Sequence, residues 1–416
     1  MTGVGDHLIV DIESVAHGGH FISRVDGRVL FVRHAIPGER VEVVITGQGP
    51  KGRFLLADVV GVVEPSPDRV VPPCRFSADC GGCDFQHVSI GRQRRLKAEV
   101  LREQLSRLAG LSVIGDQPLE RAVDVVEVPG DSNGLNWRTR VRFAVDDDGR
   151  IGLRRHHSHA VVPIDECALA TPALTSVGVQ THRWSGSRDV TVVAASSGDR
   201  VVVPEPSHVG TPARSLPVDV AVPGLRGRGW VREQAGGRDW RVAADGFWQV
   251  HPGAPEALVG HVRKVLSPHS GEHLLDLYSG VGLFAGLLAS DLGPTGQIDA
   301  VEVSAQACSD ARRNLHDLPS VRIHQSAVDS WLAANEDLRP NIVVLDPPRG
   351  GAGKRVIEAI LALRPRAVAY VACDPAALGR DLGYVRAQGW QVSSVQGFDL
   401  FPMTHHMEAV ALLLPA

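Results

Sequence analysis

The sequence is poor in several kinds of residue, and these shortages narrow its class. Aromatic residues make up 5% of its 416 residues, and it has three methionines. It contains no apolar run of the roughly 18 residues that a transmembrane helix needs. Its first residues also lack the basic and apolar regions of a signal peptide. We therefore expect a cytoplasmic protein that does not enter a membrane.

Charge of one sign does not dominate either. The 43 basic and 47 acidic residues give a formal charge of −4, so binding to nucleic acid would depend on local basic patches. Lysine is scarce, with four residues against 39 arginines. Codon usage or a preference for bidentate phosphate contacts explains this bias. The hydrophobic fraction of 44% excludes a disordered or collagen-like chain.

Residues 1–63 are predicted to form a small all-β barrel of the OB-like kind. Short β-rich runs alternate with glycine-containing turns, which is typical of such barrels. The runs lie at residues 7–12, 27–33, 39–45 and 55–62. Four prolines between residues 64 and 73 then mark a domain boundary, because proline interrupts both ladders and helices.

Residues 64–240 are predicted to form a mixed α+β central domain. Apolar residues at helical spacing over 90–108, with arginines on the remaining surface, indicate a basic amphipathic helix. Its basic face is either a solvated surface or a phosphate contact, and the helix could pack with the following domain. Residues 138–145 and 149–155 predict a hairpin, and 170–240 indicate further β structure.

Residues 241–416 are predicted to form a C-terminal α/β domain with a doubly wound, Rossmann-like sheet. From residue 272 onward, strand and helix patterns alternate, which is the signature of parallel strands joined by helices. The expected strands lie at residues 273–277, 297–302, 321–324, 342–345, 367–371, 390–398 and 409–414.

The first two of these strands have the layout of a nucleotide-binding βαβ unit. Gly280 and Gly282 follow the first strand and let the backbone approach a ligand closely. Glu302 ends the second strand, where its carboxylate can accept both hydroxyls of a ribose. The full GxGxxG pattern is missing, so a single adenosyl group is favoured over a dinucleotide.

The cysteines divide into a group and two isolated residues. Cys80 and Cys83 form a CxxC pair, which can converge on one ion or cluster. Cys74 and Cys167 bring the potential thiolate ligands to four, a number that zinc fits equally well. Cys308 belongs to no motif and is interpreted as a packing residue.

Five motifs in the C-terminal half carry a family resemblance. The segment 276–280, DLYSG, resembles the first motif of class I S-adenosylmethionine methyltransferases. DPPRG at 346–350, YVACDP at 370–375 and FPMTHHME at 401–408 follow in order, and GFWQ stands upstream at 246–249. The series resembles the RNA 5-methyluridine methyltransferases. The resemblance extends through nearly all of the C-terminal half.

The resemblance implies that Cys373 is the nucleophile and Glu408 the base. In this chemistry a thiolate adds to C6 of uracil, C5 then takes the methyl group, and a base removes the C5 proton. The alternatives are a buried packing role for Cys373 and a plain surface role for Glu408. The resemblance also implies contacts with S-adenosylmethionine at positions besides the two glycines, namely Gln249, Tyr278, Glu302 and Asp346.

Three positions depart from the family pattern. Ser279 replaces a cysteine found in many relatives, which should be harmless, and Leu283 replaces a polar residue that contacts the cofactor in some relatives. Asp374 stands where asparagine follows the nucleophile in many members. A carboxylate there should raise the pKa of the Cys373 thiol, unless a basic neighbour such as Arg349 compensates.

The resemblance extends to the N-terminal half. Residues 1–63 resemble a TRAM domain, a small RNA-binding barrel. Relatives with this cysteine spacing carry a [4Fe-4S] cluster, so the resemblance favours that cluster over zinc or free thiols, on a set of ligands that comprises Cys74, Cys80, Cys83 and Cys167.

The resemblance also implies a monomer acting on structured RNA without a protein partner, with 23S rRNA favoured over tRNA. Two rival functions stay open. One is methylation of a base nitrogen, for which an aromatic residue would be expected where Arg349 stands. The other is a non-catalytic RNA-binding or chaperone protein that has kept the fold.

Overall fold

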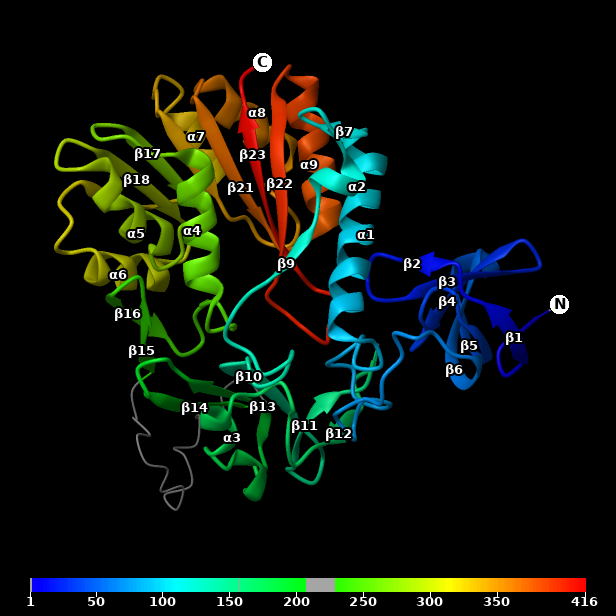
Figure 1. Ribbon diagram of the computed structural model, residues 1–416. Coiled ribbons are helices and arrows are strands. Elements are labelled where there is room, and N and C mark those ends of the chain that lie inside the picture. The colour runs from blue at the N-terminus through cyan, green and yellow to red at the C-terminus, as the bar shows by residue number, and fades with distance from the viewer. Residues whose placement is uncertain (1, 157, 207–228) are drawn as a thin grey trace.

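The computed structural model describes residues 2–156, 158–206 and 229–416. They form three parts built on sheets, and helix α1 (Ile90–Ala109) stands between the N-terminal barrel and the C-terminal sheet (Figure 1). The part of the expected β structure that falls on residues 207–228 lies outside the described residues. None of the described helices combines the length and hydrophobicity that crossing a membrane requires.

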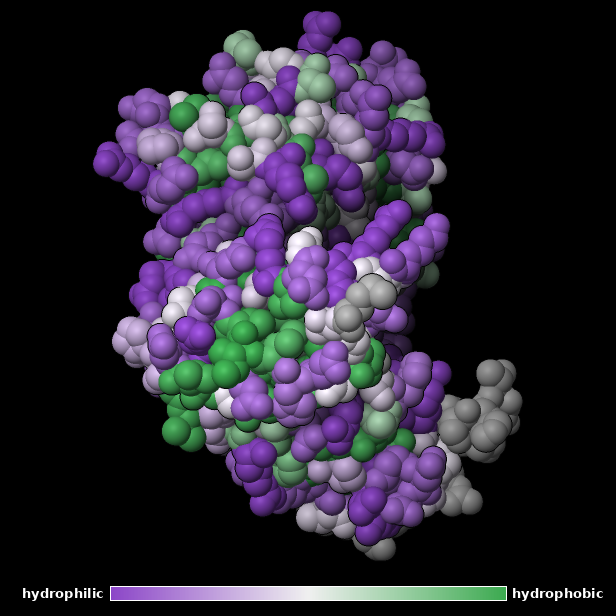
Figure 2. Space-filling model, turned by 90° about the vertical axis from the view of Figure 1, so that its right-hand side faces the viewer, coloured by the Kyte–Doolittle hydropathy of each residue, from purple (hydrophilic) through white to green (hydrophobic). Residues whose placement is uncertain are grey.

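The N-terminal part is a six-stranded sheet in the order β1-β5-β6-β4-β3-β2, which curls so that β1 also contacts β3. The strands are β1 (His7–Asp11), β2 (Ser14–Val15), β3 (Phe21–Val25), β4 (Arg28–Arg33), β5 (Arg40–Gln48) and β6 (Phe54–Glu64). Alternate side chains point inward, so Phe21, Leu30 and Val43 are closed off from solvent in its core. Its outer face keeps apolar side chains exposed, and Figure 2 shows them gathered over this part.

The central part is an antiparallel five-stranded sheet in the order β12-β11-β10-β13-β14. Its strands are β10 (Arg140–Val145), β11 (Ile151–Arg154), β12 (Val161–Pro163), β13 (Ser187–Ala194) and β14 (Arg200–Pro206). The hairpin expected around residues 147–149 is confirmed, because β10 pairs with β11 there. A separate hairpin of β15 (Trp230–Ala235) and β16 (Arg238–Ala243) leads into the C-terminal part.

The C-terminal part is an eight-stranded sheet in the order β19-β18-β17-β20-β21-β23-β22-β9. Its strands are β17 (His273–Leu277), β18 (Gln297–Glu302), β19 (Val321–Gln325), β20 (Ile342–Leu345), β21 (Ala367–Ala372), β22 (Gln391–Asp399), β23 (Glu408–Leu414) and β9 (Val125–Glu127). The strands β17 to β21 run parallel, and β23 is antiparallel to β21. The carboxyl ends of the parallel strands therefore meet the amino end of β23 at one edge.

Helices cover both faces of this sheet. The helices are α4 (Ala254–Leu266), α5 (Leu283–Leu292), α6 (Ala305–Asn314), α7 (Val328–Ala334), α8 (Gly353–Ala362) and α9 (Pro375–Ala387). Apolar residues of α4 and α5 pack on one face, and those of α1, α7, α8 and α9 pack on the other. Helix α1 lies against α9, although the whole central sheet and most strands of the C-terminal sheet lie between them in sequence.

The seven strands expected in the C-terminal part are confirmed, but an eighth was missed. Strand β9 (Val125–Glu127) comes from the segment between α1 and the central sheet and pairs in parallel with β22. A three-residue strand has no periodicity to detect, and its pairing depends on the position of α1. Strand β2 (Ser14–Val15) was missed for the same reason.

Candidate active site

The expected catalytic residues meet at the carboxyl edge of the C-terminal sheet. Asp346 follows β20, Cys373 follows β21, and Glu408 begins β23. Strands β21 and β23 are antiparallel, with Ala372 paired to Ala409. The residues just beyond that pair, Cys373 and Glu408, therefore face each other across the two strands.

The Cys373 thiol lies in a setting that keeps it protonated at rest. Burial raises its pKa to about 12, the charges of Glu408 and Asp346 add to the increase, and Arg349 opposes it. The carboxylates that raise the pKa of Cys373 most strongly are thus Glu408 and Asp346, and not Asp374, its neighbour in sequence. The side chain of Asp374 turns instead to the start of α9, where it accepts a hydrogen bond of 2.7 Å from the Ala377 N–H.

Two buried carboxyl groups adjoin the thiol. Burial raises the pKa of Asp346 to about 7. The pKa of Glu408 is also raised, first by burial and then by the charge of Asp346. Within the described residues, Oε2 of Glu408 is buried without a hydrogen-bond partner. A carboxyl group with a raised pKa and a free oxygen can take up a proton near neutral pH.

The loop after β17 has the geometry of a ligand-binding turn. Tyr278, Gly280 and Gly282 all have positive φ angles, of 61°, 54° and 92°. A Cβ atom at Gly282 would lie 2.6 Å from the Leu315 side chain, so this position requires glycine. Glu302 accepts hydrogen bonds from the N–H groups of Gly280 (3.0 Å) and Ser304 (2.7 Å). The carboxylate is thereby fixed at the mouth of the loop.

A cavity of about 410 Å³ adjoins this loop, with Tyr278, Val303 and Asp329 in its wall. Val303 follows Glu302 directly and leaves 65% of its surface exposed. Asp329 lies in the first turn of α7. Neither residue was predicted from the sequence. Their only sequence signal is that each follows the carboxyl end of a parallel strand, where open α/β sheets bind ligands.

Gln249 lies on a different segment, between β16 and α4, and it is buried. The central sheet holds this segment, because Arg140 donates a hydrogen bond of 2.8 Å to the Gly246 carbonyl. Phe247 next to it is 72% exposed. Phe247 was not predicted as a site residue, although it belongs to the GFWQ motif.

The four clustered cysteines line one small cavity of about 20 Å³, although Cys167 is far from the other three in sequence. Burial raises the pKa of Cys80, and the nearby Cys167 and Cys74 add to the increase. Among the described residues, no group of three or more His, Cys, Asp or Glu side chains is arranged to hold a metal ion. Cys308 lies apart, and its thiol donates to the Glu302 carbonyl (3.3 Å).

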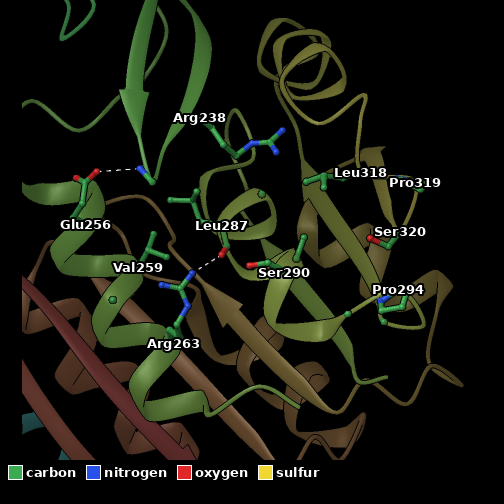
Figure 3. Close-up of a pocket in the computed structure, with 16 residues that line it drawn as sticks. Arg238, Glu256, Val259, Arg263, Leu287, Ser290, Pro294, Leu318, Pro319 and Ser320 are labelled. Carbon is green, nitrogen blue, oxygen red and sulfur yellow. Dashed lines mark hydrogen bonds between the residues drawn. The ribbon is translucent and has the colours of Figure 1, made fainter. Parts of the chain in front are cut away.

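A larger cavity of about 870 Å³ lies at the opposite edge of the sheet, beside the loops that lead into β18 and β19 (Figure 3). Arg238 and Arg263 stand on either side of Leu287 there. Both arginines are already paired, Arg238 with Asp317 (2.6 Å) and Arg263 with Asp291 (2.9 Å). This cavity holds none of the expected site residues.

Comparison with curated proteins gives the family. An RNA methyltransferase of Streptomyces avermitilis is 46% identical over 99% of both chains. The chain belongs to the RNA methyltransferase family. A second member, from Bifidobacterium longum, is 38% identical over 97% of this chain and 95% of its own.

Two family models refine this placement. Residues 333–415 match the model described as tRNA (Uracil-5-)-methyltransferase, and residues 2–60 match the TRAM domain. The expected family, S-adenosylmethionine-dependent RNA uracil-5-methyltransferases with a TRAM domain, is thus confirmed.

A solved structure of similar fold is the Pyrococcus abyssi tRNA (uracil-54, C5)-methyltransferase in complex with S-adenosyl-L-homocysteine. It is 22% identical, with a TM-score of 0.69, and the match covers 97% of this chain and 99% of that one. Together with the TRAM match, it confirms the expected fold class of a barrel, a mixed central part and a Rossmann-like methyltransferase part.

Proposed function

We propose that this enzyme methylates C5 of a specific uridine in structured RNA, with Cys373 as the nucleophile and Glu408 as the base. The pairing of β21 with β23 is the observation that supports this most directly. It sets the thiol and a partly unsatisfied carboxyl group opposite each other, at the edge where the cofactor loop also ends.

The residues match the steps of this reaction. The Cys373 thiol loses its proton and its sulfur bonds to C6 of uracil, which makes C5 nucleophilic. Bound S-adenosylmethionine supplies the methyl group as an electrophile. Glu408 then takes the C5 proton, and the bond between sulfur and C6 breaks to release the methylated base. Because burial raises the pKa of Glu408, its carboxylate is a stronger base than an exposed one.

The cavity beside Tyr278 fits the cofactor. The Glu302 carboxylate keeps lone pairs for the two ribose hydroxyls. The exposed face of Val303 offers an apolar surface for an adenine ring, and Asp329 an acceptor for its amino group. Tyr278 and Gln249 would hold the methionine part and Asp346 the reactive end, as the resemblance implies.

We further propose that Cys74, Cys80, Cys83 and Cys167 hold a [4Fe-4S] cluster, because all four line one cavity. The loop that carries Cys80 and Cys83 also fixes residues 400–407, the catalytic loop between β22 and β23, since Asp84 binds His405 (2.6 Å) and the N–H groups of Asp84 and Phe85 donate to the Met403 carbonyl. The cluster would thus support the loop that leads to Glu408.

The RNA class has two candidates. Relatives with both the barrel and the cysteine set usually act on 23S rRNA, which we take as the first substrate. The second candidate substrate is tRNA, because the P. abyssi enzyme that is named for tRNA shares the fold of the whole chain.

The test is methylation of unmodified 23S rRNA and tRNA transcripts by the anaerobically purified protein with labelled S-adenosylmethionine. We expect label in 5-methyluridine, absent with Cys373→Ala and retained with Cys308→Ser, which alters a buried cysteine whose hydrogen bond to the Glu302 carbonyl a serine can keep. Label on a base nitrogen would support the rival methyltransferase. No label in any RNA, despite cofactor binding, would support the non-catalytic reading.

A further inference from the structure

A pocket of about 150 Å³ lies beside Cys373, and its wall comes from parts of the chain that are far apart in sequence. Ala16, His17 and Gly18 of the loop between β2 and β3 contribute the barrel side. Phe85, helix α1, the loops after β20 and β21, and the catalytic loop contribute the rest. The barrel thus reaches the nucleophile itself.

One contact connects the barrel directly to the nucleophile loop. His17 Nε2 lies 3.0 Å from Oδ2 of Asp374, the residue that follows Cys373. The same barrel loop packs closely on the catalytic loop, because a Cβ atom at Gly19 would lie 3.0 Å from His405 and 3.1 Å from Asp84. These contacts therefore fix the position of the His17 side chain.

We propose that His17 is a positioning residue of the active site: it balances the charge of Asp374, so that this carboxylate does not oppose ionisation of the Cys373 thiol. The barrel would then take part in the reaction as well as in RNA binding. This inference rests on the proposed role of Cys373 as the nucleophile.

The charges around Cys373 make such a balance necessary. Burial, Glu408 and Asp346 already raise the pKa of the thiol to about 12. An unbalanced third carboxylate in the next residue would raise it further, because like charges disfavour a thiolate. Burial raises the pKa of Asp374 as well, but the hydrogen bond from His17, the hydrogen bond from the Ala377 N–H and the charge of His17 together outweigh it, so Asp374 stays ionised.

The charge of His17 responds to Asp374 in return. The hydrogen bond to Asp374 raises the pKa of His17 above 6.5, burial opposes this, and on α1 Glu103 raises it while Arg107 lowers it. His17 therefore carries more positive charge near neutral pH than a free histidine. The other ionisable groups around the Cys373 pocket are Lys97 on α1, Arg349 after β20, and His405 and His406 before β23.

Charge balance and a merely mechanical link predict different results. If His17 only fastens the barrel, its loss should matter equally with aspartate or asparagine at position 374, since asparagine can still accept a hydrogen bond. If His17 balances a charge, Asp374→Asn should remove the need for it. The double-variant comparison therefore separates the two roles.

The experiment measures alkylation of Cys373 by iodoacetamide over a series of pH values, in the intact anaerobic protein without RNA, read by peptide mass spectrometry. We expect His17→Ala to slow alkylation about tenfold at neutral pH and to move its profile to higher pH. Asp374→Asn should react within about twofold of the parent rate, because the charge that it removes is already balanced. Adding His17→Ala to Asp374→Asn should change the rate by less than about twofold.

His7→Ala is the matched control, because His7 pairs with Glu42 (3.1 Å) on the barrel but does not line the pocket. Should His17→Ala prevent folding, His17→Asn in the same two backgrounds replaces it. Unchanged alkylation in His17→Ala, or an equal loss in both backgrounds, would overturn the proposal. Because no RNA is present, a failure of the proposed methylation does not affect this result.

A parallel assay with RNA completes the test. Charge balance predicts that His17→Ala lowers kcat about tenfold while the affinity for RNA stays within about twofold. A loss confined to RNA affinity would assign His17 to binding alone and contradict the proposal.

Discussion

Lys97 of α1 donates a hydrogen bond of 2.5 Å to Asp399 at the end of β22, and at most 2% of either side chain is exposed. Its ammonium group also donates to the Phe401 carbonyl (3.0 Å). The pair fastens α1 to the segment that leads into the catalytic loop. One of the four lysines in the chain thus forms a buried ion pair.

Lys97→Ala should destabilise the protein strongly. It leaves the Asp399 carboxylate buried without its cation, which typically costs about 3–5 kcal/mol. Urea unfolding should show this loss. Lys354→Ala is the control, since Lys354 is exposed and 3.9 Å from Glu358, and its effect should stay below about 0.5 kcal/mol. Equal effects of the two changes would refute the structural role of the pair.

Much of the catalytic sheet was predictable because its strands are continuous apolar runs bounded by turns. The expected bounds of β17, β18 and β20 agree with the structure residue for residue. Strand β9 was not predictable, because its three residues become a strand only when β22 offers an edge. Local pattern therefore specified the strands that are buried on both faces, and tertiary contacts specified the short edge strand.

The site residues that could be predicted from the sequence are those that belong to recognisable motifs. Cys373 and Glu408 were identified from such motifs, and the strand pairing brings them to one edge. The contact between Asp374 and His17 was not predictable, because the two residues lie 357 positions apart in sequence. Val303 and Asp329 were missed because no motif letter distinguishes them. Contacts between domains, and the residues that line a cavity, can be identified only when the fold is known.

Stability should depend on pH through Asp299, which is hydrogen-bonded to His273 (2.7 Å) and His324 (2.6 Å) across three neighbouring strands. Burial raises the pKa of Asp299, but the two histidines outweigh it, so the pKa lies below the ordinary value of 3.8. A lowered pKa stabilises the fold above that value, and this contribution is lost as the pH falls through the folded pKa.

Asp299→Asn should therefore cost about 2 kcal/mol at neutral pH and progressively less as the pH falls below 3.8. Urea unfolding of both proteins across this range measures the difference. Asp337→Asn, at an exposed position just after α7, should show no such trend. A constant difference for Asp299→Asn at every pH would contradict the linkage.

Glu302→Gln should weaken binding of S-adenosylmethionine by about tenfold, because the amide loses one acceptor oxygen and the charge. Calorimetric titration without RNA measures this directly. Glu272→Gln is the matched control, since Glu272 pairs with Arg366 at the other end of β17. Unchanged affinity in Glu302→Gln would exclude Glu302 as the ribose ligand.

Replacing one cysteine of the set should abolish the iron-sulfur cluster. Cys167→Ser should lose the visible absorbance, the iron and the acid-labile sulfide of the anaerobic protein, because each thiolate holds one iron. Cys308→Ser should keep all three, since Cys308 is a buried residue of α6 and does not line the cavity of the other four. Zinc in the parent protein, in the amount of one ion per chain, would refute the cluster.

Glu408→Gln should trap the reaction after methyl transfer. Cys373 can still add to C6 and C5 can still take the methyl group, but the amide cannot accept the C5 proton. A covalent complex of protein and RNA should therefore accumulate and survive denaturing electrophoresis, while turnover falls by about 10²-fold or more. The adduct should contain the labelled methyl group.

Two further variants make this result decisive. Cys373→Ala combined with Glu408→Gln should give no adduct, because the sulfur that bonds to the base is gone. Glu358→Gln changes an exposed carboxylate on α8 and should turn over like the parent without a trapped complex. If folded Glu408→Gln protein turns over normally, another group removes the proton. The nearest carboxyl group with a raised pKa, that of Asp346, would then take the place of Glu408 in the mechanism.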